Sequence, residues 1–104
     1  MSRHLTPLEV VERLIAPVKH LGGRLGYHAK SAYHWRAGSR WRDPGDMPPA
    51  ANRRALLVAE LVGAPLVPRH LIWGASAEEI EALEAALAAG ISPATLRAAV
   101  ADGP

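Results

Sequence analysis

Cysteine is missing from this chain of 104 residues. Without it the protein has no disulfide bond, no zinc site with thiolate ligands, no iron–sulfur cluster and no cysteine nucleophile. Long apolar runs are missing too, since none approaches the roughly 18 residues that a membrane-spanning helix needs. The first residues contain no apolar stretch followed by a cleavage site, as a secretory signal would. The sequence therefore predicts a small cytoplasmic protein that does not enter a membrane.

Motifs for catalysis and ligand binding are also absent. Serine, histidine and acidic residues are scattered and form no nucleophile motif. The glycines between Leu21 and Gly26 lack the spacing and the following lysine of a phosphate-binding loop. His28 and His34 have no third candidate ligand, and a metal site needs three or four. We therefore expect no enzymatic activity, no metal, no cofactor and no small-molecule ligand.

Charge is distributed unevenly although the net charge is only +2. Of the 12 lysines and arginines, 10 lie in residues 1–54, beside 4 of the 10 acidic residues. Residues 55–104 hold the remaining 2 and 6, so this half is acidic. This asymmetry predicts that the first half meets a polyanion such as nucleic acid.

Apolar residues recur every three or four positions, which predicts an all-α chain without strands. Thr6-Pro7 is a typical helix start, with the threonine as cap and the proline in the first turn. Pro17 ends this helix and begins a second one that reaches Leu25. A third helix is expected from about His28 to Arg36, followed by irregular residues 37–47, which are rich in turn formers.

The second half predicts a helix from Pro49 to about Val62 and a short helical turn within residues 66–74. A capping box of Ser76 and Glu79 starts the next helix, and Ser92-Pro93 opens a weak last helix to about Ala101. The residues expected to be buried are Leu56, Leu57, Leu61 and Val62, then Leu66, Leu71, Ile72 and Trp73, and then Ile80, Leu83 and Leu87. For Leu83 and Leu87, the pattern fits the chain's own core and a dimer contact equally well.

The region from Leu21 to Trp35 has the spacing of a helix-turn-helix. Gly22 supplies a small residue where two helices would touch, and Gly26 can adopt the positive φ that the turn needs. The apolar residues that flank the turn and anchor the second helix are Leu21, Leu25, Tyr27, Ala32 and Trp35.

This stretch resembles the Cro/CI-like (lambda repressor-like) helix-turn-helix family of phage and prophage regulators. A similar family variant is Leu-Ala-x-x-Leu-Gly-Val-x-x-x-Thr-Val-x-x-Trp, followed by Ile-Pro and an apolar helix. Leu21, Leu25, Gly26 and Trp35 match it, Tyr27 and Ala32 replace its valines, and Met47-Pro48 replaces Ile-Pro. The resemblance covers roughly residues 7–75. It departs at Gly22-Gly23, each costing about 1 kcal/mol in a helix, and in the longer link 38–47.

The resemblance implies a recognition helix, at about residues 28–36, that lies in the major groove of double-stranded DNA. The positions that it assigns to base contacts are Ala29, Lys30, Tyr33 and His34. The residues placed for phosphate contacts are Lys19, His28, Ser31, Arg36, Arg40 and Arg42. The chemistry fits, because lysine can donate to guanine O6 and N7 and an alanine methyl can meet the thymine methyl. Phosphate contacts would fix the register without reading sequence.

Each of these positions also has a purely structural alternative. Lys30 and His34 can be solvated surface residues. The run Arg40-Trp41-Arg42 can be a packed tryptophan between solvated arginines, and we expect a structural Trp41 with at least one arginine on DNA. Arg53-Arg54 are expected to be helix-surface charges or partners of Glu60, and Trp73 is expected in the core.

We therefore expect an all-α, five- to six-helix DNA-binding domain over residues 1–75 and a C-terminal helical extension over 76–104. The function that follows is a bacterial or phage transcriptional repressor that binds an inverted-repeat operator as a homodimer. Ile80, Leu83 and Leu87 are the expected dimer contact, because the acidic extension should point away from DNA. The alternative is a protein-interaction adaptor that uses the helix-turn-helix as a scaffold; an antitoxin or small phage packaging subunit would keep the DNA affinity.

Overall fold

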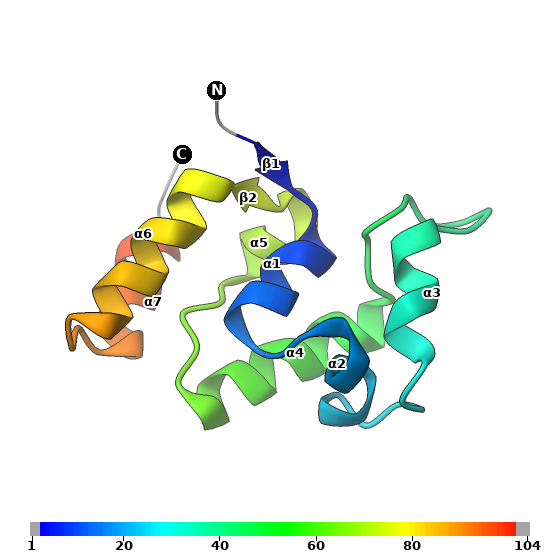
Figure 1. The fold of residues 1–104 in the computed structure, drawn as a ribbon, viewed down its shortest axis with the longest axis horizontal. Coiled ribbons are helices and arrows are strands. Elements are labelled where there is room, and N and C mark those ends of the chain that lie inside the picture. The colour runs from blue at the N-terminus through cyan, green and yellow to red at the C-terminus, as the bar shows by residue number, and fades with distance from the viewer. Residues whose placement is uncertain (1–2, 102–104) are drawn as a thin grey trace.

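The computed structural model describes residues 3–101. Helices make up 64% of residues 3–101, so the expectation of a mainly helical protein is confirmed, although seven helices are formed there and five to six were expected. The elements, in chain order, are β1 (His4–Leu5), α1 (Pro7–Leu14), α2 (Val18–Arg24), α3 (Ser31–Ala37), α4 (Pro49–Val62), α5 (Pro68–Trp73), β2 (Ala75–Ser76), α6 (Ala77–Ala88) and α7 (Pro93–Ala101). Along the longest axis, α3 lies at one end and the pair α6–α7 at the other (Figure 1). Residues 1–2 and 102–104, at the ends of the two predicted domains, lie outside the described part.

Two short strands correct the prediction of a chain without strands. Strands β1 and β2 pair antiparallel, with His4 opposite Ser76 and Leu5 opposite Ala75. Gly74 makes the approach possible, because a Cβ on it would lie 2.0 Å from the carbonyl oxygen of Leu5. Strands of two residues are too short for alternation of apolar and polar positions to reveal them.

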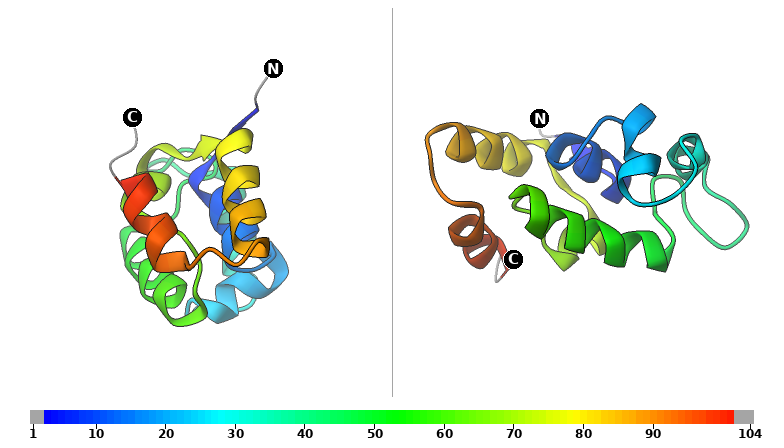
Figure 2. Two further views of the ribbon diagram at one scale, coloured as in Figure 1. Left: turned by 90° about the vertical axis from the view of Figure 1, so that its left-hand side faces the viewer. Right: turned by 90° about the horizontal axis from the view of Figure 1, so that it is seen from below.

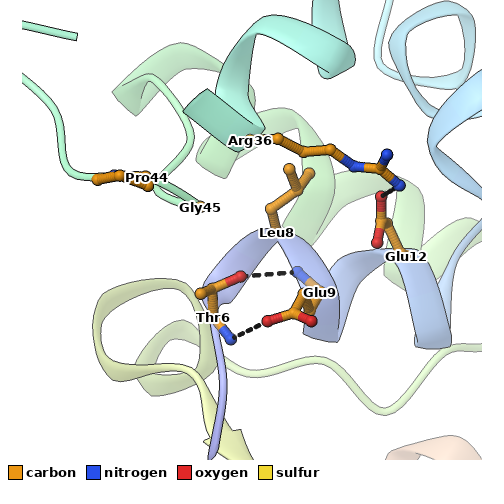
Figure 3. A pocket seen from close by; sticks show the side chains of 7 residues that line it. All are labelled: Thr6, Leu8, Glu9, Glu12, Arg36, Pro44 and Gly45. Atoms are coloured by element: carbon orange, nitrogen blue, oxygen red, sulfur yellow. Dashed lines mark hydrogen bonds and ion pairs between the residues drawn. The ribbon is translucent and has the colours of Figure 1, made fainter. Parts of the chain in front are cut away.

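The start of α1 agrees with the prediction. Thr6 caps the helix with its hydroxyl, which accepts from the backbone N–H of Glu9 at 3.2 Å, and Thr6 N–H donates to the Glu9 carboxylate at 3.1 Å (Figure 3). Burial raises the pKa of Glu9, but the hydrogen bonds from Thr6 and the charge of Arg3 outweigh it and leave this pKa lowered. Leu8 and Val11 are buried in the core as expected.

Helix α4 buries the face opposite to the one predicted. Its buried residues are the alanines Ala51, Ala55 and Ala59, whereas Leu57 is 62% and Leu61 85% exposed. The sequence carries two apolar stripes on this helix, and the small one packs inward because alanine lets backbones approach closely. The residues wrongly expected in the core also include Val62, which is exposed, and Leu56, which is half-buried.

The short helix α5 also departs from the prediction at its end. Leu66 and Leu71 are buried as expected, but Ile72 and Trp73 are exposed, the latter by 73%. A helix of one and a half turns has room for few inward positions, and His70 and Leu71 take them.

His70 is the buried polar residue of the core and joins α5 to α6. Its Nδ1 accepts the backbone N–H of Val67 at 3.2 Å, so Nε2 carries the proton and donates to Oε2 of Glu79 at 2.6 Å. The same oxygen accepts from Arg69 at 2.8 Å. Burial lowers the pKa of His70 despite the neighbouring carboxylate. Burial raises the pKa of Glu79, but the bonds from Arg69 and His70 outweigh this and leave it lowered.

Helices α6 and α7 contribute side chains to the same hydrophobic core as the helices before them. Ser76 caps α6, accepting from Glu79 N–H at 3.1 Å, but the other half of the predicted capping box is not formed, because the Glu79 carboxylate binds Arg69 and His70 instead. Ile80, Leu83 and Leu96 are buried in the same cluster as Leu8. The expected dimer contact is therefore corrected for Ile80 and Leu83, which the chain's own core already covers, while Leu87 is half-buried against that core.

Candidate nucleic-acid interface

Helix α2 packs closely, at Gly22, against the turn that precedes α3. A Cβ on Gly22 would lie 2.5 Å from the carbonyl oxygen of His28 and 3.3 Å from that of Ala29, so only glycine fits without a shift of the backbone. Gly26 has φ +80° in the turn between the helices. The expected role of Gly26 is confirmed, whereas Gly22 is at a close approach of α2 to the turn before α3 and not to the helix itself.

Apolar residues around the turn hold α3 against the rest of the fold. Leu21, Leu25, Ala32 and Trp35 are buried. Tyr27 meets Trp35 edge-on, with ring centroids 5.4 Å apart. Arg54 also stacks on the Tyr27 ring, with its guanidinium carbon 4.9 Å from the centroid, and donates to the carbonyl oxygen of Leu25 at 3.2 Å. Sequence reasoning placed Arg54 on the helix surface and missed this contact, because it joins residues far apart in the chain.

Helix α3 begins later than predicted. The prediction placed its start near His28, but its first residue is Ser31. The backbone N–H of Lys30 donates to Nδ1 of His28 at 3.2 Å, and Ser31 N–H donates to the His28 carbonyl oxygen at 3.0 Å. Ala29 and Lys30 therefore lie in a turn before the helix, because the His28 side chain and carbonyl bind the backbone groups there.

The residues predicted to contact bases share one exposed segment. Ala29 and Lys30 lie in the turn before α3, and Tyr33 and His34 lie in its first two turns; all four are exposed. Arg36 reaches back over the ring of Tyr33, with its guanidinium carbon 5.7 Å from the centroid.

The residues predicted to contact phosphates divide into two groups. Lys19 on α2, His28 and Arg40 are exposed, and Ser31 is half-buried. Arg36 and Arg42 also hold the scaffold. Arg36 donates to the Glu12 carboxylate of α1 at 3.1 Å (Figure 3).

Arg42 closes the loop between α3 and α4. Its Nε donates to the carbonyl oxygen of Asp46 at 2.8 Å, and its guanidinium also reaches Ser39 Oγ and the carbonyl oxygen of His34, each at 3.4 Å. A bridge between Ser39 and Arg42 makes residues 39–42 a tight hairpin. Trp41 at its tip is 86% exposed with Arg40 stacked over the ring at 5.0 Å, so the prediction of a packed, structural Trp41 is wrong.

Gly45 joins this loop to two helices. Its N–H donates to the carbonyl oxygen of Trp35 and its carbonyl accepts from Leu8 N–H, both at 2.8 Å. A Cβ at this position would lie 2.5 Å from Thr6, and φ is +87°. Gly45 thus positions the C-terminal end of α3 on α1 (Figure 3). The Pro44-Gly45 pair indicated a turn in the sequence, but nothing there indicated its two partners.

Carboxylates are absent from the chain around this surface. No aspartate or glutamate occurs between Glu12 and Asp43, whereas lysine and arginine recur throughout. Every exposed titratable side chain of the α2–α3 unit is therefore basic or neutral near pH 7, which suits an anionic partner.

Two hollows border the α3 end of the molecule. One of about 290 Å³ lies between α1 and the loop, and Glu9, Glu12 and Arg36 line it. Its charged groups are already paired with one another or with Arg3. The other, a groove of about 820 Å³, runs under the 39–42 hairpin to Ile72.

Among residues 3–101, no cluster of three or more histidines, aspartates and glutamates is suited to hold a metal ion. No helix in this part of the chain has the length and apolar character needed to cross a membrane. The chain matches no protein-family model, no curated protein and no solved structure.

Proposed function

We propose that this protein binds double-stranded DNA sequence-specifically, with the turn at Ala29-Lys30 and helix α3 in the major groove. The observation that carries the proposal is the close approach of α2, at Gly22, to the turn before α3, which holds an exposed helix without carboxylates at one end of the molecule. This arrangement supports a helix-turn-helix of the Cro/CI-like kind. The function that follows is a transcriptional repressor, because a bound protein blocks polymerase by occupancy alone.

The exposed side chains supply the chemistry for base contacts. Lys30 can donate to guanine O6 and N7, and the Ala29 methyl can contact a thymine methyl. A neutral His34 can donate or accept. Tyr33 brings a hydroxyl to the same helix face. One short helix reads only a few base pairs, so a homodimer on an inverted repeat would multiply the specificity.

Phosphate contacts would come from the edges of this surface. Lys19 and Arg40 are exposed, and no described hydrogen bond or ion pair occupies their cationic groups. Arg36 and Arg42 already bind Glu12 and the loop carbonyls, so we assign them first to the positioning of α3. Arg40 at the hairpin tip extends the basic surface beyond α3.

Selection from a random duplex library at about 150 mM salt, with sequencing of the bound pool, tests the proposal. An enriched inverted repeat is the expected result. If about six phosphates are contacted per dimer, a plot of log K for DNA binding against log salt concentration should have a slope of about −5. A pool without enrichment, together with binding that vanishes as salt rises, would contradict sequence-specific binding.

Two variants separate base contacts from phosphate contacts. The double variant Lys30→Ala, His34→Ala should lose the preference for the selected site over random duplex. Lys19→Ala is the control, because the loss of a phosphate contact weakens all sequences alike and keeps the preference. If the double variant prefers the selected site over random duplex as strongly as Lys19→Ala does, α3 does not contact the bases.

A protein-interaction adaptor is the second candidate. The observation that favours it is the exposed apolar side chains of Leu57, Leu61, Ile72 and Trp73. An adaptor would bind its protein partner unchanged after Lys30→Ala, His34→Ala, whereas a repressor would lose operator binding. An antitoxin or packaging subunit would bind DNA and a protein partner together.

A further inference from the structure

The outward face of α4 is an apolar surface between two opposite charges. Leu57 and Leu61 point away from the core, on the side opposite the buried Ala51 and Ala55. Arg53 lies one turn before Leu57, and Glu60 lies one turn after it. Helix α4 runs along the near side of the molecule in the right-hand view of Figure 2, with α7 beside its C-terminal end.

A groove of about 650 Å³ adjoins this face, between α4 and α7. Its walls are mainly apolar and include Leu56, Val67, Pro68 and Ala98. Arg97 also lines it and donates to the carbonyl oxygen of Ala64 at 2.9 Å, which ties α7 to the segment after α4. The groove is therefore a fixed hollow beside protruding leucines.

Arg53 and Glu60 are both exposed on this face. Within residues 3–101, neither side chain takes part in an ion pair or a hydrogen bond. They stand two helical turns apart, about 10.5 Å along the axis, which is too far for them to pair with each other. Of the two roles expected for Arg53, the structure therefore shows the exposed helix-surface charge and not a pair with Glu60.

We propose that this face binds a second copy of the chain through an antiparallel α4–α4 contact. A two-fold axis near Leu57 brings Arg53 of each copy to Glu60 of the other, so both ion pairs form at once. The two Leu57 side chains meet near the axis. An isologous interface needs a self-complementary surface of this kind, in which residue i meets residue j and j meets i.

The charge pattern favours a second copy over other occupants. A DNA backbone would be repelled by Glu60 and would leave Leu57 and Leu61 in water. A purely acidic or purely basic protein segment would satisfy one charge and be repelled by the other. A second copy supplies both partners at the same spacing, and it covers an apolar surface that is costly to leave exposed.

This dimer requires no DNA, so its test uses none. Sedimentation equilibrium of the full chain, from about 1 µM to about 1 mM, should show a reversible monomer–dimer equilibrium. Leu57→Asp should weaken association by about tenfold or more, because it places two carboxylates near the axis. Ile72→Asp is the matched control: Ile72 is as exposed as Leu57, and its change should leave association unaltered.

Charge reversal tests the antiparallel pairing itself. Arg53→Glu and Glu60→Arg should each weaken self-association by about threefold to tenfold, through like charges at both ends. The double variant should recover wild-type association. A mixture of the two single variants should form heterodimers in preference to either homodimer, which native mass spectrometry resolves.

Three results would overturn the proposal: a wild-type chain that stays monomeric to about 1 mM, a dimer unaffected by Leu57→Asp, or no recovery in the double variant. A monomeric chain would direct the search for an occupant to a different protein. Operator selection would be measured separately, so failure of this interface leaves the DNA proposal standing on α3, and failure of DNA binding leaves the interface standing.

Discussion

Gly22 and Gly23 are neighbours in α2 with opposite surroundings, so alanine at the two positions should change stability with opposite sign. A Cβ at Gly22 would stand 2.5 Å from the His28 carbonyl oxygen, against an ordinary contact of 3.4–4 Å. The obstacle is backbone on the facing segment, which cannot rotate away as a side chain can. A Cβ at Gly23 would meet nothing within 4 Å.

The expected magnitudes follow from these distances. Overpacking against a fixed neighbour costs up to about 3 kcal/mol, and alanine gains about 1 kcal/mol over glycine in a helix. Gly22→Ala should therefore lower the free energy of unfolding by about 2 kcal/mol, which lowers Tm by roughly 10 °C for a domain of this size. Gly23→Ala should raise the free energy of unfolding by about 0.5–1 kcal/mol.

Urea denaturation followed by far-UV circular dichroism measures both variants under the same conditions. Equal stabilisation by the two alanines would refute the close approach of α2 to the His28–Ala29 turn, since it would mean that Gly22 has free space. This turn leads directly into α3, so its position also affects the direction of α3. We therefore expect Gly22→Ala, but not Gly23→Ala, to weaken DNA binding in the folded protein.

Three further predictions concern the loop, the tryptophans and the buried histidine. Trp35→Ala should cost about 3–5 kcal/mol, whereas Trp41→Ala should change stability by less than about 0.5 kcal/mol because this ring is exposed; thermal unfolding compares them. Arg42→Ala should speed amide hydrogen exchange in residues 38–48, and unchanged exchange would contradict its role in closing that loop. Folded His70 has a lowered pKa, so the unfolded state binds more protons below about pH 6.5. Stability should therefore fall as the pH drops below that value, and His70→Gln should flatten that part of the profile; the lowered pKa of Glu79 adds a loss at still lower pH.

Two helix starts were predictable because they rest on local chemistry. Thr6-Pro7 and Ser76 carry capping signals that a few neighbouring residues define, and both begin helices in the structure. Gly22 and Gly26 were predictable for a similar reason. The turn after α2, and the close approach of α2 to the residues that follow this turn, each require glycine at a fixed spacing.

The orientation of α4 was not predictable from periodicity. Hydrophobicity favoured burial of Leu57 and Leu61, but in the structure the smaller Ala51 and Ala55 face the core and the two leucines are exposed. The helical period shows which residues share a face and does not show which of two apolar faces turns inward.

Contacts between distant segments escaped prediction for a different reason. Gly45 joins Trp35 to Leu8, and Arg54 joins Leu25 to Tyr27. Each depends on how the elements pack in three dimensions. Helix α3 begins later than predicted because the His28 side chain accepts from the Lys30 N–H. The helix has only seven residues, and its own helical propensity is too weak to replace this hydrogen bond.

The pairing of His4–Leu5 with Ala75–Ser76 has a consequence for the order in which the chain folds. These strands close a loop that contains helices α1 to α5, and closing a long loop carries an entropic cost that local helix contacts do not. During synthesis, the first strand leaves the ribosome long before its partner exists. We therefore expect β1, although it is made before its partner, to be among the last elements to reach their final positions, with docking of α6 and pairing of β1 as one late step.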